Sequence, residues 1–107
     1  MKNSHNILMA KKYANLLREK LRDEIVSVYF YGSRAFGKEK IDSDLDIFIV
    51  LKKAIKYNSK PNNTIFDIAN RLNTENIYIS PITYSKKYFN KYENTLFINE
   101  VKKGIKV

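Results

Sequence analysis

Two acidic side chains, two residues apart, are the clearest candidates for chemistry in this sequence of 107 residues. Asp44 and Asp46 lie in segment 43–51, SDLDIFIVL, whose far end is wholly apolar and predicts a buried strand. Side chains two apart in a strand leave the same face, so these Cβ atoms would lie about 6–7 Å apart. Oxygen ligands at that spacing can hold one or two divalent ions and favour Mg²⁺ or Mn²⁺. The plainer alternative is a pair of solvated acids at the start of a strand.

A glycine and a serine after another predicted strand could form a phosphate site beside these acids. Segment 25–31, IVSVYFY, is the β-branched and aromatic run typical of a buried strand, and Gly32 and Ser33 end it. Glycine lets the backbone approach a ligand closely, and the N–H groups and hydroxyl that follow can bind phosphate oxygens. Arg34 either binds phosphate as well or forms a structural ion pair with Asp42. A nucleoside triphosphate with its Mg²⁺ could bridge the two strands, as phosphoryl transfer requires.

The spacing of these residues resembles that of a known family. Gly32 and Ser33, ten further residues, and then Asp44 and Asp46 form the Gly-Ser and Asp-x-Asp signature of DNA polymerase β-like nucleotidyltransferases. The wider pattern, GSRAFG followed by SDLDIFIV, is similar to the minimal nucleotidyltransferases, which are small prokaryotic proteins. The resemblance implies a polymerase β-like fold and transfer of a nucleoside monophosphate, usually AMP from ATP, to a hydroxyl or similar acceptor.

The same resemblance assigns roles to individual residues. It implies that Gly32 and Ser33 bind the triphosphate, with Arg34 as a weaker phosphate contact. Asp44 and Asp46 would be the catalytic carboxylates and the ligands of Mg²⁺, or of Mn²⁺ in its place, with ATP as the substrate. Many minimal nucleotidyltransferases are encoded beside a helical HEPN protein, often a ribonuclease toxin, and some adenylylate a tyrosine of that partner. The resemblance therefore also implies a helical HEPN-type partner and a role in a toxin–antitoxin pair.

One departure from the family pattern concerns a third carboxylate, which the family carries on the strand after the middle helix. Here Tyr78 stands about where that acid is expected, and Glu75 is the only nearby candidate. Loss of a general base slows a reaction by about 10²–10⁴-fold. The sequence thus leaves two hypotheses open, an active nucleotidyltransferase and a weak or inactive antitoxin-like subunit that binds its partner. It also leaves open whether Glu75 or a residue of a partner replaces the acid.

The remaining pattern predicts a small sheet covered by helices. Apolar spacing predicts a first helix whose start Ser4 could cap, and Pro81 predicts that the third strand ends there or lies at an edge. Thr64 and Ser85 are candidate caps of later helices. The order α-β-β-α-β-α-α predicts one α/β (α+β) domain, 1–107, with its first two strands antiparallel. The expected helices are 4–22, 64–73, 85–94 and 95–103, and the expected strands are 25–31, 43–51 and 76–82.

Composition narrows the possible functions further. The chain has no cysteine and one histidine, which excludes disulfide scaffolds, thiolate metal sites and thiol nucleophiles. No apolar run is long enough to span a bilayer and no signal peptide is evident, so we expect a cytoplasmic protein without a membrane partner. The net charge is +9, and residues 52–107 carry 11 basic and 4 acidic side chains. That excess makes nucleic-acid binding a weaker third alternative, beside the plainer one of a solvated lysine-rich surface.

Overall fold

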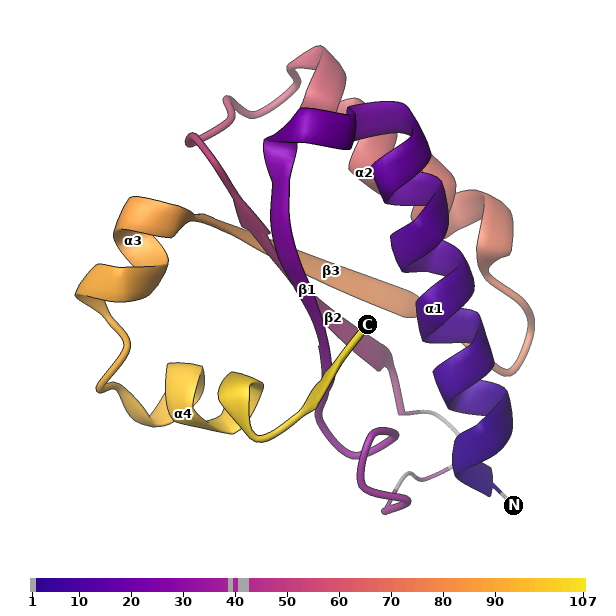
Figure 1. Ribbon diagram of the computed structural model, residues 1–107. Helices are drawn as coiled ribbons and strands as arrows, with labels where there is room; N and C mark the ends of the chain where they lie inside the picture. Colours follow the sequence, from indigo (N-terminus) through magenta and orange to yellow (C-terminus); the bar gives the residue numbers. More distant parts are fainter. Residues whose placement is uncertain (1, 39, 41–42) are drawn as a thin grey trace.

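The helices and strands follow one another as the sequence predicts, and the computed structural model adds a last short strand (Figure 1). The structure describes residues 2–38, 40 and 43–107. The order α-β-β-α-β-α-α is confirmed, and β4 follows it at the end of the described chain. The elements are α1 Lys2–Leu21, a 3₁₀ turn Arg22–Glu24, β1 Ile25–Tyr31, β2 Leu45–Leu51, α2 Lys60–Leu72, β3 Ile79–Ser85, α3 Lys86–Lys91, α4 Leu96–Lys102 and β4 Ile105–Lys106.

The four strands form one mixed sheet in the order β3-β2-β1-β4. β1 pairs with β2 antiparallel, as predicted, and the register places Tyr31 opposite Asp46. β2 pairs with β3 parallel, with Leu45 beside Ile79 and Asp46 beside Ser80. The end of β1 and the starts of β2 and β3 therefore meet at one edge of the sheet, which we call the acid end.

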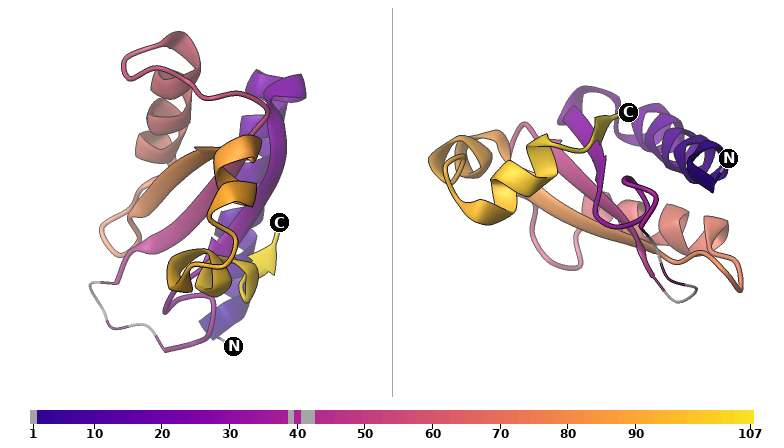
Figure 2. Two further views of the ribbon diagram at one scale, coloured as in Figure 1. Left: turned by 90° about the vertical axis from the view of Figure 1, so that its left-hand side faces the viewer. Right: turned by 90° about the horizontal axis from the view of Figure 1, so that it is seen from below.

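The two faces of the sheet are covered by different helices. Figure 2 shows α1 and α2 on one side and α3 and α4 on the other. We call these sides the α1–α2 face and the α3–α4 face. On the α1–α2 face, Leu45, Ile47 and Ile79 join the larger core, which is mostly aliphatic. On the α3–α4 face, Phe48 is fully buried at the centre of a smaller cluster that is rich in aromatic rings.

Two element boundaries differ from the prediction because of proline. Helix α2 begins four residues before the predicted start, since Ser59 is its N-cap and Pro61 lies in its first turn, where a missing N–H costs nothing. Thr64 lies inside the helix and its hydroxyl donates to Lys60 O. Strand β3 runs through Pro81 to Ser85 and does not end at the proline. Because β3 is an edge strand, as the alternative interpretation of Pro81 predicted, one side of it needs no N–H donor.

Smaller corrections concern the ends of three other elements. Helix α1 starts at Lys2, so Ser4 lies within it and not at its cap. Strand β2 begins at Leu45, so Asp44 precedes the strand and only Asp46 lies within it. The predicted strand 76–82 is displaced by three residues, because Asn76 belongs to a turn that the Thr74 hydroxyl stabilises by accepting from its N–H.

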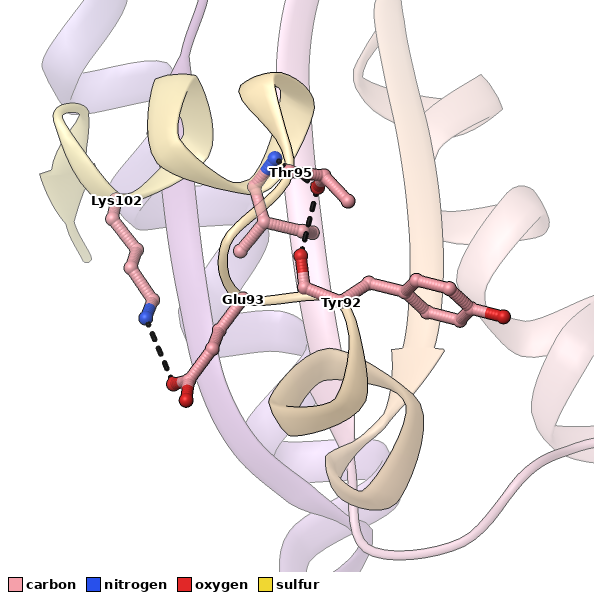
Figure 3. Close-up of polar contacts among 5 residues, drawn as sticks. Tyr92, Glu93, Thr95 and Lys102 are labelled. Carbon is pink, nitrogen blue, oxygen red and sulfur yellow. Dashed lines mark hydrogen bonds and ion pairs between the residues drawn. The ribbon is translucent and has the colours of Figure 1, made fainter.

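Helices α3 and α4 are short and are joined by a tight turn (Figure 3). Ser85 caps α3 as predicted, since its hydroxyl accepts from Tyr88 N. Thr95 caps α4 and also donates to Tyr92 O at 2.7 Å, and Lys102 pairs with Glu93 across the turn at 3.4 Å. These local contacts hold the two helices over the edge of the aromatic cluster. In the described part of the chain, no helix is both long and apolar enough to cross a membrane.

Candidate functional site

The two aspartates lie at the acid end and point to the same side of the sheet. Leu45 and Ile47, which flank Asp46, are fully buried in the core of the α1–α2 face. Because successive side chains of a strand alternate, Asp46 leaves the opposite, α3–α4 face. Asp44 lies one residue before β2, where the hydrogen bond from Leu45 N to Tyr78 O continues the pairing with the next segment, so it leaves the same side. Asp44 is exposed and Asp46 is half-buried. The structure thus brings both predicted carboxylates to one open edge, anchored by an apolar strand.

Gly32 lies directly against the second of these carboxylates. Its φ is +83°, in the left-handed region that side chains disfavour. A Cβ placed on Gly32 would overlap the Oδ2 atom of Asp46 and would lie 3.2 Å from its Cγ. No other residue type fits this position without a shift of Asp46. The close approach of backbone and carboxylate explains why a glycine stands between the strand and the predicted phosphate site.

The turn after Gly32 leaves two backbone donors available. Gly32 O accepts from Ala35 N at 3.1 Å, and Ser33 O accepts from Phe36 N and Lys38 N at 3.2 and 2.9 Å. Within the described residues, the N–H groups of Ser33 and Arg34 donate to no protein acceptor. Donors of this kind in a tight turn are suited to an anion such as phosphate. The predicted residues Gly32 and Ser33 are therefore brought together with Asp46.

The electrostatics of the acid end favour a bound cation. Burial, and then the charge of Asp44, raise the pKa of Asp46 to about 6 from an ordinary value of 3.8. On the neighbouring strand β1, burial and the charges of Asp46 and Tyr84 raise the pKa of Tyr31 to about 12. Both pKa values rise because burial and nearby negative charge disfavour the ionised form of each group. A divalent cation between the two carboxylates would relieve this cost, and its preferred ligands are the oxygen atoms present here.

Arg34 takes a different place from the predicted phosphate contact. Its side chain is only 7% exposed, and its guanidinium donates to Ser43 O at 2.7 Å, Asn76 O at 2.8 Å and Asn6 Oδ1 at 3.2 Å. These contacts tie helix α1 to the residues that precede β2 and β3. The Arg34 guanidinium therefore holds together the segments that form the acid end. Its predicted contact with phosphate stays a prediction. The alternative partner Asp42 lies outside the described residues.

The residues that could replace a third carboxylate lie at the start of β3. Glu75 is exposed in the turn before this strand. In the residues that the structure describes, no group of three or more histidine, cysteine, aspartate or glutamate side chains could hold a metal. Ser80 is the β3 residue in register with Asp46, and Tyr78 precedes it by two positions on the same side. Tyr78 and Ser80, the two residues beside the aspartates in this register, thus carry hydroxyl groups and no acid.

Sequence reasoning missed the residues that hold the site in place. Asn6 is buried and meets Arg34 across 28 positions of the chain, and Asn76 offers only its backbone carbonyl. Neither contact has a periodic or motif signal, because each depends on the packing of distant elements. The sequence indicates only that Tyr31 ends a strand. That Tyr31 lies opposite Asp46 follows from the register of the sheet.

Comparisons with known proteins place this geometry in a family. The family model described as polymerase beta, nucleotidyltransferase matches residues 11–106. Among solved structures, the chain is similar to a candidate nucleotidyltransferase from Sulfolobus solfataricus, with a TM-score of 0.50 and 21% identity, covering 99% of this chain and 86% of that one. This likeness supports the fold alone, and no curated protein matches the sequence. The polymerase β-like fold expected from the Gly-Ser and Asp-x-Asp signature is confirmed, and the chain belongs to the polymerase beta, nucleotidyltransferase family.

Proposed function

We propose that this protein is a Mg²⁺-dependent nucleotidyltransferase that moves AMP from ATP to a hydroxyl acceptor. One observation carries the proposal, namely the contact between the Gly32 backbone and the Asp46 carboxylate. It sets the turn with its available N–H donors beside Asp46, and Asp44 is near enough for its charge to act on the same carboxylate. Family membership supports nucleotidyl transfer in general, and the metal, the nucleotide and the acceptor are our proposal.

Each residue would then have a distinct task. The N–H groups of Ser33 and Arg34, with the Ser33 hydroxyl, would bind phosphate oxygens of the triphosphate. Asp44 and Asp46 would hold Mg²⁺, which neutralises charge on the phosphates during transfer. Arg34 would keep the segments that carry these groups in register through its three hydrogen bonds. Gly32 would allow the turn and the carboxylate to stay in contact.

The acceptor in this proposal is a hydroxyl group on a partner protein, and a helical HEPN-type protein is the candidate partner. Exposed apolar side chains on the α3–α4 side support a protein partner, because a monomer rarely leaves several together in water. Leu96 is 86% exposed, and Tyr88 and Phe97 of the same two helices are partly exposed. The net charge of +9 supports a nucleic acid acceptor only in general terms, so that acceptor is the weaker alternative.

A second candidate function is an antitoxin-like subunit that binds its partner and transfers nucleotide slowly or not at all. The observation that favours it is the start of β3, where the described residues provide hydroxyl groups and no carboxylate beside Asp44 and Asp46. A missing general base lowers the rate by about 10²–10⁴-fold and leaves metal and nucleotide binding intact. The two candidates therefore differ in turnover and agree in binding.

Calorimetric titration of ATP with Mg²⁺ into the full chain tests the proposal. We expect saturable binding that requires the metal and is lost in the double variant Asp44→Asn with Asp46→Asn. The matched control is Asp67→Asn, which removes an exposed carboxylate from α2, far along the chain from the turn. Binding that survives in the double variant, or that needs no metal, would contradict the proposed site.

Turnover is measured separately on the complex with the co-encoded partner, if a helical partner accompanies the gene. Labelled ATP reports transfer of AMP to that partner as a labelled protein band. Glu75→Gln tests whether this exposed glutamate serves as the base, since it removes the charge and keeps the shape. Unchanged transfer in Glu75→Gln would assign the base to another group, and binding without transfer would favour the antitoxin-like subunit.

A further inference from the structure

A single exposed phenol stands at the acid end. Tyr78 comes directly before β3, and its side chain is 57% exposed. Its backbone carbonyl accepts from Leu45 N at 2.8 Å, which fixes it against the start of β2. Extending the parallel register of Leu45 with Ile79 by one residue places Tyr78 beside Asp44. Neighbouring strands of a sheet lie about 4.8 Å apart, so these two residues are direct neighbours.

The direction of the Tyr78 side chain follows from the residues on either side of it. Ile77 and Ile79 are both buried and belong to the core of the α1–α2 face. Tyr78, which lies between them, therefore leaves the opposite side of the sheet. Asp44 leaves that same side, because its neighbour Leu45 is buried in the α1–α2 core. The phenol and the carboxylate thus leave the same side, each one residue before the start of its strand.

The other tyrosines do not share this placement. Tyr13 is buried and donates its hydroxyl hydrogen bond to Ile65 O at 2.9 Å. Tyr31 faces Asp46 in the register, but its side chain is buried. Tyr57 is 93% exposed, yet it lies in the connection between β2 and α2, beyond the opposite end of β2. The remaining ones, Tyr29, Tyr84, Tyr88 and Tyr92, pack against other rings of the α3–α4 side.

We propose that Tyr78 is itself an acceptor, so that the chain transfers a nucleoside monophosphate to its own phenol. The inference rests on the proposed function, because it needs a nucleoside triphosphate at Gly32, Asp44 and Asp46. The side chain of tyrosine is longer than that of aspartate, so its oxygen reaches beyond the carboxylates, toward phosphates bound to them. A phenol also gives up its proton more readily than an aliphatic alcohol, which suits a site without a third carboxylate.

The transfer balances with the groups named. The Tyr78 oxygen forms a bond to the α-phosphorus of the nucleotide. The bond from that phosphorus to the bridging oxygen of the β-phosphate breaks, and pyrophosphate leaves. The phenol proton passes to water, and no oxidant or reductant takes part. The product is a phosphodiester between Tyr78 and the nucleoside, which would cover Asp44 and close the site to a second nucleotide.

The direct test is mass spectrometry of the full chain after incubation with ATP and Mg²⁺. We expect a gain of one adenylyl group, which peptide mapping places on Tyr78. Tyr78→Phe keeps the ring and removes the hydroxyl, so it should lose the modification entirely and still bind ATP in the calorimeter. The matched control Tyr57→Phe, in an exposed loop, should be modified like the wild type.

A second readout does not depend on turnover. Mild iodination followed by peptide mapping reports how accessible each tyrosine ring is. ATP with Mg²⁺ should protect Tyr78 from iodination and leave Tyr57 unchanged. Equal iodination of Tyr78 with and without nucleotide would overturn the inference, because the phenol would then lie away from the bound phosphates.

The outcomes separate the two proposals. ATP binding without any modification would overturn the role of Tyr78 and leave the proposed nucleotide site standing. A modification that persists in Tyr78→Phe, or that maps to Ser80 or Tyr31, would also overturn it, since another hydroxyl would be the acceptor. If the wild type binds no ATP in either measurement, the nucleotide site and the self-transfer are both wrong.

Discussion

The two faces of the sheet contrast in how completely they are covered. On the α1–α2 face, sheet side chains such as Ile47 and Ile79 are buried beneath helices of 20 and 13 residues. On the α3–α4 face, helices of six and seven residues leave Ile82 and Phe97 partly exposed, and the acid end lies open. The sheet is thus well packed on one side and accessible on the other.

This difference indicates a division of tasks between the faces. Alternation along β2 sends Leu45 and Ile47 into the core of the α1–α2 face and Asp46 to the α3–α4 face. Asp44, one residue before β2, leaves on the same side as Asp46. The α1–α2 face therefore fixes the backbone that carries the carboxylates, and the α3–α4 face gives a ligand access to them. A carboxylate on a strand anchored in this way is held in position by its backbone.

The largest expected effect compares the same substitution on the two faces. Ile47→Ala removes a fully buried side chain from the α1–α2 core and should lower the free energy of unfolding by about 3 kcal/mol. Ile82→Ala, on the open side, should cost about 1 kcal/mol, because Ile82 is already 37% exposed. Urea unfolding of both variants measures the difference. Equal losses would show that the two faces contribute alike to stability.

The strands and their faces could be predicted because their apolar patterns are local. Segment 25–31 forms β1 at the predicted bounds, and the apolar run after Asp46 forms the core of β2. The bounds of α2 and β3 could not be predicted in the same way. Pro61 is tolerated because it lies in the first turn of α2, and Pro81 because β3 is an edge strand, and both positions depend on how the chain folds around them.

A second prediction breaks the link that Arg34 forms between α1 and the segments that precede β2 and β3. Arg34→Met removes the donor to Asn6, Ser43 and Asn76, and leaves these acceptors without that partner. We expect a loss of about 2–3 kcal/mol in the free energy of unfolding. ATP affinity should fall as well, because the segments that carry Asp44 and Tyr78 lose their brace. Thermal unfolding and calorimetric titration measure the two effects.

Arg71→Met is the matched control, since Arg71 lies exposed in the last turn of α2. It changes the net charge by the same amount and should leave stability within about 0.5 kcal/mol of the wild type. A loss as large as that of Arg34→Met would assign the effect to charge and not to the hydrogen bonds.

In the candidate site, the sequence indicated which residues would lie together but not what holds them there. Gly32 lies against Asp46 as the spacing indicates, because Gly32 directly follows β1 and Asp46 lies near the start of the paired strand β2. Ser33 and Asp44 are close to them along the chain. The role of Arg34 was not predictable, since its partners lie 9, 28 and 42 positions away. Sequence patterns report local structure and motif spacing, whereas this network depends on how distant segments pack.

A third prediction tests the contact between Gly32 and the Asp46 carboxylate. Gly32→Ala places a methyl group against Asp46 and also strains a residue with φ of +83°. We expect a loss of about 2 kcal/mol in the free energy of unfolding, and loss of Mg²⁺-dependent ATP binding. Gly37→Ala meets a similar backbone penalty, since the φ of Gly37 is +68°. If both variants bind ATP equally well, contact with Asp46 does not matter to the site.

The smallest expected effect concerns how the free energy of unfolding depends on pH through Asp46. Because the pKa of Asp46 is raised to about 6 in the folded state, ionisation of this carboxyl opposes folding. Well below the ordinary pKa of 3.8 the group is protonated in both states and has no effect. As the pH rises from there to about 6 the unfolded chain loses the proton first, so stability falls, and above about 6 the penalty is complete. Since Asp46 is only half-buried, water screens this penalty, and we expect it to be about 1 kcal/mol.

The substitution Asp46→Asn removes this titration, so it should raise the midpoint of thermal unfolding at about pH 7.5 and leave it unchanged at about pH 3. Asp67→Asn on α2 controls for the loss of a charge. Added Mg²⁺ should stabilise the wild type at the higher pH and not the Asp46→Asn variant, because the ion offsets the same repulsion. The Asp46→Asn variant could instead be less stable than the wild type at the higher pH without metal. That result would show that the charged Asp46 makes a favourable contact and stabilises the fold, which contradicts the prediction.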